Sequence, residues 1–216
     1  MSRPLLLGHR GARALKSIPE NTLASFDKAL ADGCHGFEFD VRLTADEEAV
    51  ICHDPKLGEF KIERTTAQQL SHLPRLRDVL KRYQATAFLD IELKVRGLEK
   101  TTTDLFLRHK PRRGFVVSSF LPGVLKALHA EDAATPLGLI CEFKNQLRLW
   151  SELPVEYVIP HYALLDLELI HKVKGAGKKI IVWTVNAPAD MRRFAEWGVD
   201  GIISDDTSLL CRTLAA

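Results

Sequence analysis

The chain has 216 residues, of which 46% are hydrophobic and 27% are charged, and its formal net charge is +2. This length suits one domain with a sizeable core, and the composition is ordinary for a soluble globular protein. A net charge so close to zero gives no support for a nucleic-acid partner or for an acidic membrane surface. No apolar run approaches the roughly 18 residues of a membrane span, so we expect no integral membrane segment.

The spacing of the cysteines indicates the redox state of the compartment in which the protein works. The four of them lie far apart along the chain, at Cys34, Cys52, Cys141 and Cys211. This spacing argues against a zinc site and is compatible with reduced thiols. We therefore expect a cytoplasmic protein.

Taken in chain order, short apolar runs alternate with amphipathic helical patterns. Strands are predicted at 4–8, 36–41, 86–93, 114–118, 136–141, 157–160, 179–185 and 201–204, and the run at 49–52 continues or doubles the second strand. Helices are predicted at 23–30, 76–83, 98–109, 122–131, 144–153, 166–174 and 187–196, and a last short helix opens at Asp206 or Thr207.

Eight strand–helix alternations with short connections in about 200 to 250 residues match a closed (β/α)₈ barrel, the TIM-barrel fold of the α/β class. An open doubly wound sheet is the alternative fold, because alternation alone cannot show closure. We expect a single domain over residues 1–216. The stretch at 54–74, after the second strand, is a short, reduced insertion with too few residues for a capping subdomain with a core of its own.

Carboxylates collect near the ends of the second and third strands. Glu38 and Asp40 alternate with apolar neighbours and so share one strand face, which by itself fits an exposed acidic face as well as a metal site. Glu92 follows in the third strand, and three carboxylates suit a hard cation, Mg²⁺ or Ca²⁺, better than zinc. Asp90 shares the alternation of Glu92 and is expected one layer deeper, or against a neighbouring Lys or Arg.

Histidines and fixed positive charges fall at the same strand ends. His9 and His53 can divide into general base and general acid, because an imidazole with a pKa of about 6.5 is populated in both forms near neutrality. Arg10 and Lys94 supply fixed positive charge, for which a phosphate is the obvious anion. A metal, cations and two histidines together indicate phosphoryl transfer from a diester.

These motifs resemble those of the glycerophosphodiester phosphodiesterase family. The matching pieces are His-Arg-Gly at 9–11, Pro-Glu-Asn-Thr at 19–22, Glu-Phe-Asp-Val at 38–41, His-Asp at 53–54, Glu-Leu-Lys at 92–94, Ser-Phe at 119–120, Trp-Thr-Val-Asn at 183–186 and Gly-Val-Asp-Gly-Ile-Ile-Ser-Asp at 198–205. Each piece alone is weak. Eight of them in order across nearly the whole chain make a specific signal.

The resemblance implies an enzyme of lipid and glycerol metabolism that hydrolyses glycerophosphodiesters to sn-glycerol 3-phosphate and an alcohol. It implies that Glu38, Asp40 and Glu92 hold one divalent cation and that His9 and His53 are the catalytic acid/base pair. The family mechanism is attack by the substrate's own 2-hydroxyl, which gives a cyclic phosphate that water then opens.

The resemblance also implies a set of substrate-binding residues. Arg10 and Lys94 would bind the phosphate, and Glu20 would position the first-strand loop in the substrate site. Phe120 and Trp183 would wall the pocket, although Trp183 fits a barrel-core role equally well.

Two other functions share these features. A phospholipase D-like enzyme acting on lysophospholipids would carry the same fold, metal set and histidines. A barrel that binds phosphodiesters without turnover predicts the loss of a histidine or of a metal carboxylate, and the sequence shows neither loss.

Overall fold

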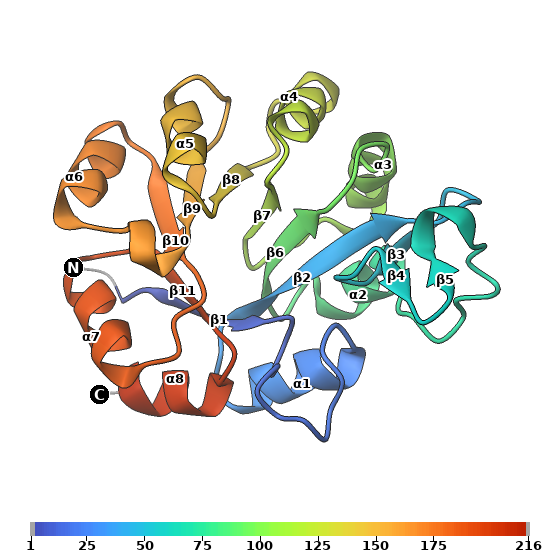
Figure 1. The fold of residues 1–216 in the computed structure, drawn as a ribbon, viewed down its shortest axis with the longest axis horizontal. Coiled ribbons are helices and arrows are strands. Elements are labelled where there is room, and N and C mark those ends of the chain that lie inside the picture. The colour runs from blue at the N-terminus through green and yellow to red at the C-terminus, as the bar shows by residue number, and fades with distance from the viewer. Residues whose placement is uncertain (1–2, 215–216) are drawn as a thin grey trace.

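The computed structural model describes residues 3–214, in which eight parallel strands form a ring surrounded by helices (Figure 1). The strands are β1 (Leu5–His9), β2 (Gly36–Leu43), β6 (Phe88–Leu93), β7 (Phe115–Ser119), β8 (Leu137–Cys141), β9 (Tyr157–Pro160), β10 (Lys179–Val182) and β11 (Gly201–Ser204). Because β1 pairs in parallel with both β2 and β11, the sheet closes on itself. Closure confirms the predicted TIM barrel and excludes the open doubly wound sheet.

Helices follow the strands around the outside of the ring. They are α1 (Leu23–Ala31), α2 (Leu76–Tyr83), α3 (Glu99–His109), α4 (Pro122–Glu131), α5 (Lys144–Leu147), α6 (Leu167–Gly175), α7 (Pro188–Glu196) and α8 (Thr207–Leu214). The side chains of Thr22 and Asp166 cap the first turns of α1 and α6, as such residues commonly do. Across residues 3–214, no helix combines the length and the apolar character needed to cross a bilayer.

Two predicted elements are shorter in the structure. The helix predicted at 144–153 splits into α5 and a 3₁₀ turn, η2 (Arg148–Ser151), before the chain reaches Pro154, which disfavours helix at the preceding residue. The strand predicted at 179–185 ends as β10 at Val182. Beyond it, Trp183 makes only an isolated bridge to His161, where a further 3₁₀ turn, η3 (Tyr162–Leu164), begins.

Two apolar layers explain why polar side chains of β2 face the barrel interior. Phe37 and Phe39 point outward and pack with Phe26 of α1, the Phe26 and Phe37 rings being stacked 4.2 Å apart. Since successive strand residues face opposite sides, this outer packing turns Glu38 and Asp40 inward. The apolar part of the inner layer consists of Leu7, Phe88, Val116, Ile140, Tyr157, Ile159, Ile181 and Ile203.

The stretch at 54–74 is short, as predicted, but it is more structured than expected. β3 (Ala49–Ile51) pairs antiparallel with β2, and a hairpin of β4 (Lys56–Leu57) and β5 (Phe60–Lys61) leads into the 3₁₀ turn η1 (Ile62–Arg64). Val50, Cys52, Ile62 and Leu70 form a separate buried cluster beneath it. Only Ile62 and Leu70 of this cluster belong to the stretch at 54–74, which therefore packs on side chains at the end of β3 and forms no capping subdomain (Figure 1).

Candidate active site

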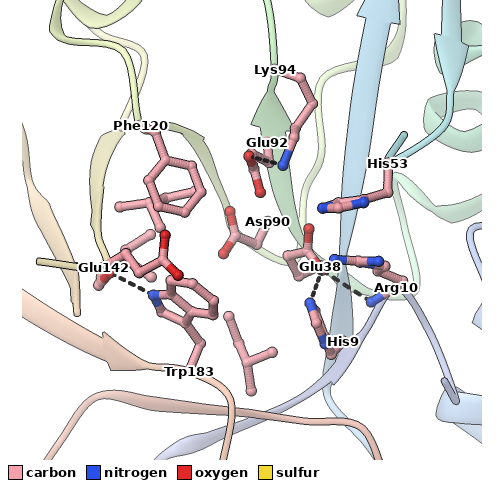
Figure 2. A pocket seen from close by; sticks show the side chains of 13 residues that line it. His9, Arg10, Glu38, His53, Asp90, Glu92, Lys94, Phe120, Glu142 and Trp183 are labelled. Carbon is pink, nitrogen blue, oxygen red and sulfur yellow. Dashed lines mark hydrogen bonds and ion pairs between the residues drawn. The ribbon is translucent and has the colours of Figure 1, made fainter. Parts of the chain in front are cut away.

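The strand register brings the predicted acidic residues together. In the parallel pair of β2 and β6, Glu38 lies opposite Asp90, and Asp40 lies opposite Glu92, one layer nearer the carboxyl end of the strands. On the other side of β2, His9 of β1 lies opposite Glu38. Figure 2 shows His9, Glu38, Asp90 and Glu92 at one pocket, which Asp40 does not line.

Three of these carboxylates form a compact cluster. Glu38, Asp40 and Glu92 each offer an oxygen atom, and the three atoms lie within 4.8 Å of one another. Glu38 Oε1 is buried and has no hydrogen-bond partner among residues 3–214. Burial and the neighbouring carboxylates raise the pKa of Glu38 well above its ordinary value and that of Glu92 to about 7. An all-oxygen set with repelling charges and a free oxygen fits a hard divalent cation.

Protein cations already offset part of this negative charge. Lys94 Nζ lies 2.6 Å from Glu92 Oε1 and 3.2 Å from Asp40 Oδ1, and Arg10 Nε lies 3.2 Å from Asp40 Oδ2. Asn21 Nδ2 donates a hydrogen bond of 2.8 Å to that same oxygen of Asp40. Burial alone would raise the pKa of Asp40, but Lys94, Arg10 and Asn21 outweigh it and hold the pKa below its ordinary value.

The loop after β1 positions Arg10. This residue adopts a left-handed backbone conformation with φ of 51°, in which its N–H donates to Glu38 Oε2 at 3.0 Å. Its guanidinium pairs with Glu20 Oε1 at 2.7 Å, and Arg13 pairs with the other Glu20 oxygen at 2.7 Å. Glu20 thus holds the Arg10 guanidinium in place by an ion pair, but Glu20 itself does not line the pocket.

His9 is held by a residue near the other end of the chain. Its Nδ1 lies 2.7 Å from Asp205 Oδ1, which leaves Nε2 facing the pocket, 3.9 Å from Glu38 Oε2. Asn186 Nδ2 donates to Asp205 Oδ2 at 2.8 Å, and Arg13 Nη1 lies 3.2 Å from Asp205 Oδ1. A carboxylate that accepts a hydrogen bond from Nδ1–H fixes the tautomer and the orientation of the imidazole ring.

His53 has a similar but more exposed partner. Its Nδ1 lies 2.7 Å from Asp54 Oδ1, and Arg42 Nε donates to its carbonyl oxygen at 2.8 Å. Partial burial lowers the pKa of His53 despite the nearby carboxylates Asp40 and Asp54. His53 reaches the same pocket as His9, from the loop after β3.

The opposite side of the pocket is aromatic and apolar. The Phe120 and Trp183 rings meet edge to face with centroids 5.7 Å apart, and Trp183 Nε1 donates to the carbonyl oxygen of Ile159 at 2.9 Å. The cavity has a volume of about 360 Å³. Its lining residues are His9, Arg10, Glu38, His53, Asp90, Glu92, Lys94, Phe120, Ile140, Glu142, Ile159, Trp183 and Ile203.

Comparisons with known proteins show the family of the chain. The sequence model of the glycerophosphoryl diester phosphodiesterase family matches residues 9–92 and 63–209. The chain belongs to this family. It is 28% identical to a glycerophosphodiester phosphodiesterase of Caldanaerobacter subterraneus subsp. tengcongensis over 96% of both chains.

Solved structures show the same fold as this member of the phosphodiesterase family. The crystal structure of a glycerophosphodiester phosphodiesterase from Thermotoga maritima has a TM-score of 0.84 at 26% identity and covers 98% of this chain and 99% of its own. A phosphodiesterase from Oleispira antarctica, solved in complex with the product sn-glycerol-3-phosphate, has a TM-score of 0.86 at 24% identity, with coverage of 99% and 98%.

The structure brings most of the predicted site residues to one pocket, whose lining includes His9, Arg10, Glu38, His53, Glu92, Lys94, Phe120 and Trp183. Glu20 and Asp40 do not line it, although Asp40 belongs to the carboxylate cluster. The sequence did not assign partners to His9, although Asn186 and Asp205 belong to two of the recognised motifs. Both residues follow the last two predicted strands, at the barrel end where such enzymes place their active sites, and this position could have indicated that they belong to the site. Asp90 is one layer deeper, as expected, but its partner is a serine, Ser118, and it lines the pocket.

Proposed function

We propose that this protein hydrolyses glycerophosphodiesters to sn-glycerol 3-phosphate and an alcohol with the help of one divalent cation. The observation that carries the proposal is the buried three-carboxylate cluster, of which Glu38 and Glu92 line the same pocket as His9 and His53. Family membership supports the substrate class. We further propose that the catalytic domain spans residues 1–216 and acts in the cytoplasm, which the four unpaired cysteines support.

Glu38, Asp40 and Glu92 would hold the cation. Their hard oxygen donors suit Mg²⁺ and Ca²⁺ alike. When bound, such an ion stabilises the negative charge that develops on the phosphate oxygens.

His9 and His53 would move the protons. One imidazole takes the proton of the substrate's 2-hydroxyl as that oxygen bonds to phosphorus, and the other protonates the leaving alkoxide as its bond to phosphorus breaks. The resulting cyclic phosphate is opened by water, with the two roles exchanged. Asp205 would keep the His9 Nε2 atom available for this exchange.

The charged and aromatic residues would bind the substrate. Arg10 and Lys94 lie beside the carboxylate cluster, where their charges favour a phosphate. Glu20 would hold the Arg10 guanidinium in place. Phe120 and Trp183 would enclose the non-phosphate part of the substrate.

Mass detection of released products tests this proposal. The purified protein is incubated with glycerophosphocholine, glycerophosphoethanolamine and a lysophospholipid, with added Mg²⁺ or Ca²⁺ and with EDTA. We expect sn-glycerol 3-phosphate from the first two substrates, with loss of the product in EDTA. A protein that releases no product from either glycerophosphodiester with either cation contradicts the proposal.

A further inference from the structure

Asp90 is a pocket residue with one unused oxygen atom. Its side chain is fully buried, and Oδ1 accepts a hydrogen bond of 2.5 Å from the Ser118 hydroxyl. Oδ2 has no hydrogen-bond partner within the described part of the chain. Buried polar atoms nearly always have a partner, so an unpaired carboxylate oxygen at a pocket surface indicates a donor supplied by a ligand.

Asp90 lies between two chemically different sides of the pocket. Figure 2 shows its carboxylate pointing into the space between Glu38 on one side and Trp183 on the other. The register of β2 and β6 puts Asp90 level with Glu38 and one layer below Asp40 and Glu92, so it lies on the deeper side of the cation cluster.

No donor among residues 3–214 lies within hydrogen-bond distance of Asp90 Oδ2. Part of the lining of the same pocket is apolar and consists of Ile140, Ile159 and Ile203, which are 4%, 1% and 2% exposed and carry no polar side-chain atom. Such a surface suits a short carbon chain. A hydroxyl at the end of that chain would meet the Asp90 oxygen.

We propose that Asp90 Oδ2 accepts a hydrogen bond from the terminal hydroxyl of the substrate's glycerol moiety and thereby determines specificity. The inference rests on the proposed function. In that reaction the 2-hydroxyl attacks phosphorus and must face the histidines, which leaves the terminal hydroxyl for the deeper part of the pocket. The three glycerol carbons then lie over the isoleucine side chains.

This assignment separates glycerophosphodiesters from lysophospholipids. An acyl group on the terminal oxygen removes its O–H, and the ester can then offer Asp90 no hydrogen. A site built around a substrate hydroxyl rejects analogues that lack it, because its own polar atom is left unpaired in a buried position. The protein should therefore discriminate against 1-acyl substrates by chemistry as well as by size.

The test compares glycerophosphoethanolamine with its 1-deoxy analogue, in which hydrogen replaces the terminal hydroxyl and the 2-hydroxyl remains. We expect the wild type to prefer the natural substrate by about 10- to 100-fold in kcat/KM, because loss of the hydroxyl leaves a buried polar atom without a partner. In Asp90→Ala the preference should fall to within about threefold. The exposed Asp104, on α3, provides the control Asp104→Asn, which should keep the wild-type preference.

Calorimetric binding of sn-glycerol 3-phosphate and its 1-deoxy counterpart gives a second readout, and the same preference is expected there. If Asp90→Ala does not fold, the wild-type comparison still decides, because a preference below about threefold overturns the inference. An equally large preference in a folded Asp90→Ala protein overturns it too. If the wild type hydrolyses neither diester, the proposed function fails as well, which is a different result from hydrolysis without discrimination.

Discussion

His9 Nδ1 lies 2.7 Å from Asp205 Oδ1, although 196 positions separate the two residues in the chain. The side chains are 11% and 19% exposed, so solvent competes weakly for this bond. His53 and Asp54 are also 2.7 Å apart, but their side chains are 35% and 65% exposed. The protein thus presents two histidine–carboxylate pairs of equal length and unequal burial.

Replacing Asp205 should impair turnover more than replacing Asp54. Asp205→Asn introduces an amide NH₂ that can donate to His9 Nδ1 and favour the other tautomer, and we expect kcat to fall by about 10- to 1000-fold with a smaller change in KM. Asp54→Asn should cost less than about tenfold, because water can replace an exposed partner. Steady-state kinetics on both variants measure the difference. A larger loss of kcat in Asp54→Asn than in Asp205→Asn would show that the more buried histidine–carboxylate pair is not the more important one for turnover.

Asp205 should also make stability depend on pH. Burial alone would raise the pKa of Asp205, but hydrogen bonds from His9 and Asn186 outweigh it and hold the pKa well below its usual range. A carboxyl whose folded pKa is lowered adds stability that is fully present above its unfolded pKa of about 4 and is lost as pH falls through the folded value. The difference in unfolding free energy between the wild type and Asp205→Asn, from urea titrations, should be constant between about pH 5 and 7 and shrink below about pH 4. A difference that grows on acidification has the wrong sign for this explanation.

Removing one carboxylate of the cation cluster should separate binding from folding. In Glu38→Gln the amide oxygen can still accept the Arg10 N–H, but a buried carboxyl group whose ionisation its acidic neighbours oppose is lost. We expect the metal-free variant to have a Tm equal to or above that of the metal-free wild type. Added Mg²⁺ or Ca²⁺ should raise the Tm of the wild type and not that of Glu38→Gln. An equal rise in both proteins would mean that Glu38 is not a ligand.

The two histidines should be needed for turnover and not for folding. His9→Ala or His53→Ala should lower kcat by about 10² to 10⁴, or about 3 to 5 kcal/mol of barrier. The exposed His129, on α4, gives the matched control His129→Ala, for which wild-type kcat is expected. Circular dichroism checks the fold of each variant. A folded His53→Ala protein that loses less than about threefold would make His53 a bystander.

The small cluster under the β4–β5 hairpin should contribute measurable stability. Ile62 is 1% exposed and packs in a cluster separate from the barrel core. Ile62→Ala should reduce the free energy of unfolding by about 2 to 4 kcal/mol through lost burial and a cavity. The neighbouring Glu63, whose side chain is 74% exposed, gives the control Glu63→Ala, with an expected change below about 0.5 kcal/mol. Equal effects of the two substitutions would mean that the burial of Ile62 in this cluster does not stabilise the fold.

Local patterns in the sequence were sufficient for the strands and for the acidic cluster. The alternation of Phe37, Glu38, Phe39 and Asp40 fixes which side chains share a face, since strand periodicity is a property of neighbouring residues. For Glu92, the Glu-Leu-Lys motif at 92–94 indicated that this residue belongs to the same acidic cluster. These predictions needed no knowledge of how distant segments meet.

The pairing of His9 with Asp205 and the exposure of Asp90 to the pocket were decided only by the tertiary structure. Both depend on barrel closure and strand register: β1 must lie beside β11 to bring Asp205 to His9, and β6 must lie beside β7 for Ser118 to occupy one Asp90 oxygen. Sequence periodicity assigns a side chain to a face but not to a partner. Partners across the barrel are chosen by the packing of the whole sheet, which minimises buried unpaired atoms over many strands at once.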